Sequence, residues 1–192
     1  MIKTMLVIFF LFPTLLFAQQ SETFDIATFS PPAGWKRESA DFAASYVITN
    51  NKTGGWCRVA IYKSIGSSGD PQVDFKSEWN NLAAKDHEGI VTPTPETTSE
   101  DGWTANSGVG KFIWQQKDAF ILLNTISGYG RVLSITVTMN SEEFMKDVEK
   151  FLNSLELIKP EGQIVSNNMP TGKLQPEQSI VITGTPGNQG IS

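Results

Sequence analysis

The chain contains one histidine and one cysteine, and neither lies in a pattern that is typical of catalysis. His87 stands between Asp86 and Glu88 in a polar stretch, which predicts a solvent-exposed imidazole. Cys57 belongs to an alternating strand pattern and is expected to be a small buried residue, whereas a reactive thiol needs partial exposure and an adjacent base. A Ser-His-Asp triad lacks the Gly-x-Ser-x-Gly segment that would present its serine. The sequence therefore predicts no catalytic residue.

Candidate metal ligands are equally scarce. One histidine and one cysteine cannot form a zinc site without carboxylates, and the alternating ligands of a calcium loop are absent. The acidic pairs Glu100-Asp101 and Glu142-Glu143 fit a solvated loop and a helix N-terminus, where negative charge is favourable. We therefore expect no metal and no cofactor. A hydrolase with paired carboxylates stays open as an alternative, because its two carboxylates need not be adjacent in the chain.

Two pairs of aromatic and arginine residues are the candidates for ligand or partner binding. Trp56 and Arg58 alternate on the non-core face of a predicted strand, and Tyr129 and Arg131 flank a predicted tight turn. Such side chains are enriched at binding hot spots when they are exposed. The alternative is that Trp56 and Tyr62 pack beneath a helix on the second face of the sheet. We expect a binding module to show an aromatic patch or shallow groove, and an enzyme to show a deep cleft lined by carboxylates or by His87.

The elements that must position these residues form an α+β pattern. Apolar residues at Phe75, Trp79 and two later positions share one face of a predicted helix, which Asp70 caps and Pro71 begins. A second helix is expected after a cap at Asn140 or Ser141 and ends near Leu155. The expected first helix is 71–85, residues 86–101 are expected to form an exposed connection, and 155–158 a short extended piece. The expected strands are 23–30, 44–49, 56–62, 103–107, 109–116, 119–127 and 131–139.

The two faces of this predicted sheet differ in character. Cys57, Val59 and Ile61 form an apolar face that we assign to the core. On the last strand, the face that carries Ser134 and Thr136 is small and polar, so we expect it to be lightly covered or left in water. The glycine-containing segments 108–110 and 128–130 are interpreted as turns of an antiparallel meander.

The first eighteen residues predict the compartment. Lys3 supplies a positive region, Met5–Phe17 is a mainly apolar run, and Ala18 offers a small residue for cleavage, which together form a secretory signal peptide. The run is too short to span a bilayer, and no second apolar stretch of spanning length follows. Gln19 stands where a bacterial lipid anchor needs a cysteine. We therefore expect export to the periplasm or the extracellular space, without a lipid anchor or an integral membrane segment after signal cleavage.

Composition adds limits on partners and organisation. The chain carries 15 Lys and Arg against 20 Asp and Glu, which argues against nucleic acid, whose phosphates need clustered positive charge. Residues 160–192 lack aromatic residues and are rich in Gly, Pro, Ser, Thr, Asn and Gln, so they cannot bury enough apolar surface to become ordered. The expected organisation is a signal peptide over 1–18, one α+β domain over 19–159, and a flexible low-complexity tail or linker over 160–192.

Two segments carry a resemblance to a known family. Phe24–Trp35 contains a strand and a Pro-Pro-Ala-Gly-Trp turn, and Val132–Leu155 forms the closing strand and helix. In these segments and in the order of its elements, the chain resembles the PsbP-like superfamily, an α/β sandwich shared with a Ran-binding nuclear import factor. The Ala-Gln-Gln junction is also similar to that of uncharacterised exported proteins of the Bacteroidetes type.

The resemblance implies an antiparallel sheet with helices packed on it, used for binding or assembly, and it transfers no functional residue. The leading hypothesis is therefore an exported, non-catalytic binding or assembly module for an unknown protein or small ligand. The alternatives are a hydrolase with an unrecognised carboxylate site and an accessory domain tethered to a missing C-terminal domain.

Overall fold

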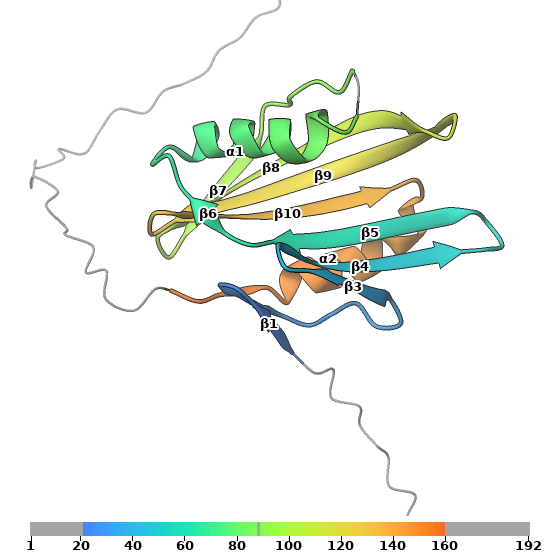
Figure 1. Cartoon of the computed structure of the whole chain (residues 1–192), viewed down its shortest axis with the longest axis horizontal. Coiled ribbons are helices and arrows are strands. Elements are labelled where there is room, and N and C mark those ends of the chain that lie inside the picture. Colours follow the sequence, from blue (N-terminus) through green and yellow to red (C-terminus); the bar gives the residue numbers. More distant parts are fainter. Residues whose placement is uncertain (1–20, 88, 160–192) are drawn as a thin grey trace, which may run out of the picture. The chain divides into compact units, whose positions relative to one another are not determined.

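The computed structural model describes residues 21–87 and 89–159, so the predicted signal peptide and tail lie outside the described residues. Within this range the chain alternates short and long strands with two main helices (Figure 1). The strands are β1 (Glu22–Phe24), β2 (Ala27–Phe29), β3 (Lys36–Ala40), β4 (Ala43–Asn50), β5 (Gly55–Tyr62), β6 (Ile65–Gly66), β7 (Glu96–Glu100), β8 (Trp103–Trp114), β9 (Lys117–Gly128), β10 (Arg131–Met139) and β11 (Glu156–Leu157). The helices are α1 (Pro71–Trp79) with the π-helical turn η1 (Asn80–Ala84), and the 3-10 turn η2 (Glu142–Phe144) with α2 (Met145–Asn153).

An antiparallel sheet forms the centre of the fold. Its strands run in the order β3-β4-β5-β10-β9-β8-β7, and β6 pairs with β10 beside this path. The strands β1, β2 and β11 form a small second sheet. Helices α1 and α2 pack on opposite faces of the central sheet (Figure 1). The predicted α+β architecture is therefore confirmed. None of the helices in the described part of the chain has the length and hydrophobicity needed to cross a bilayer.

Helix α2 covers the face that the sequence assigns to the core. Cys57, Val59 and Ile61 are fully buried there, and Val148 and Phe151 of α2 belong to the same apolar cluster. Burial raises the pKa of the Cys57 thiol to about 12, so this thiol is protonated at neutral pH. The prediction of a small, buried cysteine is confirmed.

Helix α1 covers the opposite face over β8 and β9. The predicted stripe of Phe75, Trp79 and Ala83 is buried against these strands. The close approach depends on Gly110, where an added Cβ would lie 2.5 Å from the Ile90 side chain and 2.9 Å from the Trp79 ring. The prediction that 108–110 forms a turn is wrong, because β8 runs through it without interruption and these glycines instead make room for the helix.

The polar face of β10 is also buried, which corrects the expectation that it is lightly covered or left in water. Ser134 and Thr136 are 2% and 4% exposed. The Ser134 hydroxyl donates a hydrogen bond of 2.7 Å to the Glu78 carboxylate on α1. A helix that brings hydrogen-bond acceptors to a strand can cover a polar face without leaving its hydroxyl groups unpaired.

Several boundaries differ from the predictions for local reasons. The predicted strand 23–30 is a hairpin of β1 and β2, because the chain turns at Asp25, which adopts a positive φ of 53°. The edge strands β3 and β7 are absent from the predictions, since their sequences are polar and lack hydrophobic alternation. Ser141, and not Asn140, caps the last helical segment, while Asn140 accepts a hydrogen bond from the backbone N–H of Trp56.

Candidate functional site

A pocket of about 440 Å³ opens on the α1 side of the central sheet. Helix α1 packs on β8 and β9, and the pocket extends from its C-terminal end over the neighbouring strands β10, β5 and β4. The apolar lining consists of Val47, Trp56, Tyr62, Leu82, Phe112, Trp114 and Ile121. Polar lining side chains include Thr49, Arg58, Asp86, His87, Thr136 and Thr138.

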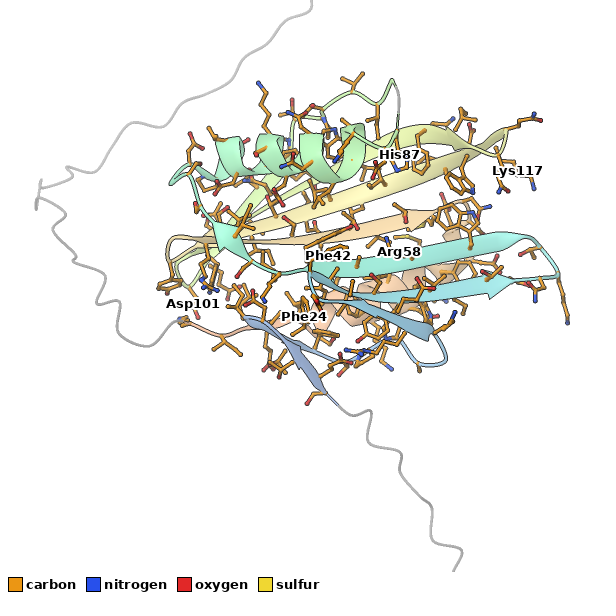
Figure 2. The ribbon with its side chains drawn as sticks, in the orientation of Figure 1. Phe24, Phe42, Arg58, His87, Asp101 and Lys117 are labelled. Atoms are coloured by element: carbon orange, nitrogen blue, oxygen red, sulfur yellow. The ribbon has the colours of Figure 1, made fainter. Side chains whose placement is uncertain are left out.

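Arg58 lies on the floor of this pocket. It is on β5 (Figure 2), and the strand register places it between Val47 of β4 and Thr138 of β10. The half-buried guanidinium donates one hydrogen bond of 3.0 Å to the Ser45 hydroxyl. No carboxylate of the described residues lies within 4.0 Å of it. Since a guanidinium has five N–H donors, Arg58 keeps donors that an acceptor in the pocket could use.

Aromatic rings form much of the apolar wall. Trp56 and Trp114 meet edge to face with their ring centroids 6.1 Å apart. Trp56 is half-buried and also packs against the apolar cluster beneath α1, as the packing alternative predicts, while its role in binding stays a prediction. Phe112 and Trp114 reach the pocket because they are two residues apart on β8 and share its α1-side face.

His87 is half-buried at the pocket, which corrects the prediction of a solvent-exposed imidazole. The segment after η1 brings its ring face to face with Phe112, at a centroid distance of 3.7 Å and an interplanar angle of 17°. Figure 2 shows His87 near the C-terminal end of the helix α1 region, apart from Arg58 on β5. Burial lowers the pKa of His87, and the neighbouring Asp86 carboxylate opposes this shift.

We expect nuclear magnetic resonance titration to give a pKa below 6.5 for His87, the chain's single histidine. Protonation then favours the unfolded chain, so the free energy of unfolding should fall as the pH is lowered through this range. Replacing Asp86 by Asn should lower the pKa further, because Asp86 stabilises the imidazolium. A measured value of 6.5 or above would contradict the half-buried placement of the ring.

The structure places Tyr129 and Arg131 away from the pocket, at the turn between β9 and β10. The Tyr129 ring packs edge to face on Trp103 at 5.0 Å, and its hydroxyl donates to the carbonyl oxygen of Asp101. Arg131 donates a hydrogen bond of 2.9 Å to the Ser64 hydroxyl. The two predicted pairs are therefore not brought together. A binding role for Tyr129 and Arg131 stays a prediction, while their observed contacts hold the turn in place.

Sequence reasoning missed the parts of the pocket that come from distant segments. Phe112 and Trp114 share a strand face, and this alternation is the signal that could have selected them. No sequence pattern predicts that His87 lies at the pocket, because its position depends on how the chain turns after η1. No group of three or more His, Cys, Asp or Glu residues in the described ranges is arranged to hold a metal.

Comparison with known proteins gives a likeness in fold at low identity. No family model and no curated protein matches the chain. A solved structure from Bacteroides thetaiotaomicron is 13% identical with a TM-score of 0.46, and the match covers 71% of this chain and 46% of that one. The Ran-binding protein Mog1p of Saccharomyces cerevisiae is 8% identical with a TM-score of 0.47, covering 74% of this chain and 97% of Mog1p.

A third solved structure is LpqN of Mycobacterium tuberculosis, described as involved in cell envelope biogenesis. It is 14% identical with a TM-score of 0.48, and the match covers 69% of this chain and 83% of LpqN. The chain thus spans less than half of the matched Bacteroides protein and most of Mog1p and LpqN. Membership of the PsbP-like superfamily stays a prediction.

Proposed function

We propose that this protein is a non-catalytic binding module that holds one small organic molecule in the pocket over β5. The observation that supports this most directly is the combination of volume and lining. A cavity of about 440 Å³ with an aromatic wall and a few polar groups has the chemistry of small-molecule sites, which measure roughly 300–1,000 Å³. An apolar ligand body would lie against Trp56, Tyr62 and Phe112, and the threonine hydroxyls would orient its polar atoms.

We further propose that this binding takes place after export, in the periplasm or the extracellular space and without a lipid anchor. The support is the signal-peptide pattern over 1–18. On this proposal the chain is a PsbP-like protein of the exported Bacteroidetes type. Assembly with a protein partner and attachment through 160–192 to a further domain are alternative forms of the same non-catalytic function.

The proposal predicts saturable binding of an uncharged aromatic probe to the full chain. N-phenyl-1-naphthylamine should bind one site, with an increase in its fluorescence. Replacing Trp56 or Trp114 by Ala should weaken binding about tenfold, because the ligand would cover apolar area of each ring and the loss of that contact costs more than about 1 kcal/mol.

Phe42 provides the matched control for this experiment. It is an aromatic residue that is 66% exposed and does not line the pocket, so Phe42→Ala should leave the affinity unchanged. Circular dichroism of each variant establishes that the fold is retained. Binding that is absent in the wild type, or that Phe42→Ala weakens as much as the tryptophan variants do, would contradict the proposal.

A hydrolase is the second candidate, because His87 and Asp86 line the same pocket as the threonine hydroxyls. The binding function is favoured, since the His87 ring stacks face to face on Phe112 and its hydrogen bond goes to the backbone of Asp86, not to a hydroxyl group that it could activate as a base. A screen of chromogenic esters tests this candidate. Turnover by the wild type that His87→Ala abolishes would establish the hydrolase and exclude the non-catalytic function.

A further inference from the structure

The pocket floor carries a positive charge, the Arg58 guanidinium, which an apolar ligand would not need. The chain has three arginines, and two of them form ion pairs. Arg37 pairs with Glu22, and Arg131 lies 3.7 Å from Asp25. Arg58 differs from both, because within the described ranges its one side-chain partner is the neutral hydroxyl of Ser45. A partly desolvated guanidinium without a carboxylate partner is stabilised when an anion approaches it.

The surroundings of Arg58 leave room for such an anion. Its neighbours across the strands, Val47 and Thr138, carry no charge, and both line the pocket with it. Asp86 also lines the pocket, but it is solvent-exposed and forms no ion pair with Arg58. Water therefore screens the repulsion between Asp86 and a ligand anion more strongly than it screens the attraction by Arg58.

We propose that the ligand is an organic carboxylate whose apolar body lies against the aromatic wall and whose charged group binds Arg58. This inference rests on the proposed function and names the ligand class for the same pocket. A planar guanidinium presents parallel N–H donors that match the two oxygens of a carboxylate, so it favours this group over a neutral amide of the same shape. The Thr138 hydroxyl, on the strand beside Arg58, provides a further donor.

The test compares 2-naphthoate with 2-naphthamide, which share a ring system and differ in charge. Ligand-observed nuclear magnetic resonance gives both dissociation constants directly with the full chain at pH 7. The wild type should bind naphthoate about tenfold or more tightly than naphthamide, as expected for charge-assisted hydrogen bonds. Arg58→Gln should remove this preference and change naphthamide binding by less than about twofold. Unchanged amide binding also shows that the pocket is intact in the variant.

Two further variants separate the role of charge from that of structure. Arg58→Lys should retain part of the preference, because it keeps the charge and loses the planar pair of donors. Arg37→Gln removes an arginine outside the pocket and should change neither ligand's affinity. Equal binding of the two ligands by the wild type, or a preference that survives Arg58→Gln, would overturn the carboxylate inference and leave the binding function standing. Failure of both ligands to bind would overturn the inference, and failure of the uncharged probe as well would overturn the proposed function.

Discussion

Replacing Trp79 by Ala is expected to lower the free energy of unfolding by about 3–5 kcal/mol, the range for truncating a fully buried aromatic residue. Trp79 is 0% exposed and lies 5.8 Å from the Phe75 ring in the cluster between α1 and the sheet. Its indole nitrogen has no hydrogen-bond partner among the described residues. Burial and packing therefore supply the stabilisation, and the variant leaves a cavity that α1 cannot close without moving toward β8.

Chemical denaturation of the full chain measures this loss, and Val73 provides the matched control. Val73 lies on the same helix but is 52% exposed, so Val73→Ala should change the free energy of unfolding by less than about 1 kcal/mol. If the two variants lose similar amounts, α1 is not held to the sheet through Trp79. Because the C-terminal end of this helical segment forms one wall of the pocket, Trp79→Ala should also weaken probe binding in the fraction that stays folded.

The elements with a strong hydrophobic period were predictable from the sequence. The stripe of Phe75, Trp79 and Ala83 and the core face of β5 both follow from side-chain geometry on a helix and a strand. The edge strand β7 was not predictable in this way, because all five of its residues are exposed and nothing in Glu-Thr-Thr-Ser-Glu marks a buried face. Pairing with β8 alone defines that strand, and pairing between distant segments leaves little local signal.

The residues of the candidate site were likewise predictable only in part. Trp56 and Arg58 were predictable, since two residue types suited to binding alternate on the face of a strand opposite the core. Tyr129 and Arg131 have the same chemistry, yet they contact other parts of their own fold, which residue type cannot reveal. The position of α1 decides which part of the sheet remains open as a pocket. That position depends on the glycines of β8, which look like turn residues in the sequence.

The second large effect is expected at Asp74, a buried carboxylate on the sheet-facing side of α1. Asp74 is 5% exposed and accepts hydrogen bonds from the Ser67 hydroxyl at 2.6 Å, the Ser68 backbone N–H at 2.7 Å and the Ser127 hydroxyl at 2.8 Å. Asp74→Asn should lower the free energy of unfolding at pH 7 by about 2–3 kcal/mol, because these bonds to a charged acceptor are weakened or lost. This side chain joins the first part of α1 to the loop after β6 and to β9, so its loss loosens both contacts.

The pH dependence of this effect has a definite sign. Burial by itself raises the pKa of Asp74, but the hydrogen bonds from Ser67, Ser68 and Ser127 outweigh it and hold the pKa below its ordinary value of 3.8. The charged form therefore stabilises the folded state above the pKa of the unfolded chain, and this stabilisation is lost as the pH falls through the folded value. The stability difference between the wild type and Asp74→Asn should be full at pH 7 and shrink below about pH 4.

Urea denaturation at pH 7, 5, 4 and 3 measures that difference, and Asp41 provides the control. Asp41 is exposed in the turn between β3 and β4, so Asp41→Asn should change the free energy of unfolding at pH 7 by less than about 0.5 kcal/mol. A difference for Asp74→Asn that grows as the pH falls would mean that the buried carboxyl is protonated in the folded state. The hydrogen bonds from Ser67, Ser68 and Ser127 would then not stabilise a charged carboxylate. This outcome would contradict the proposed reason for the stability loss in Asp74→Asn.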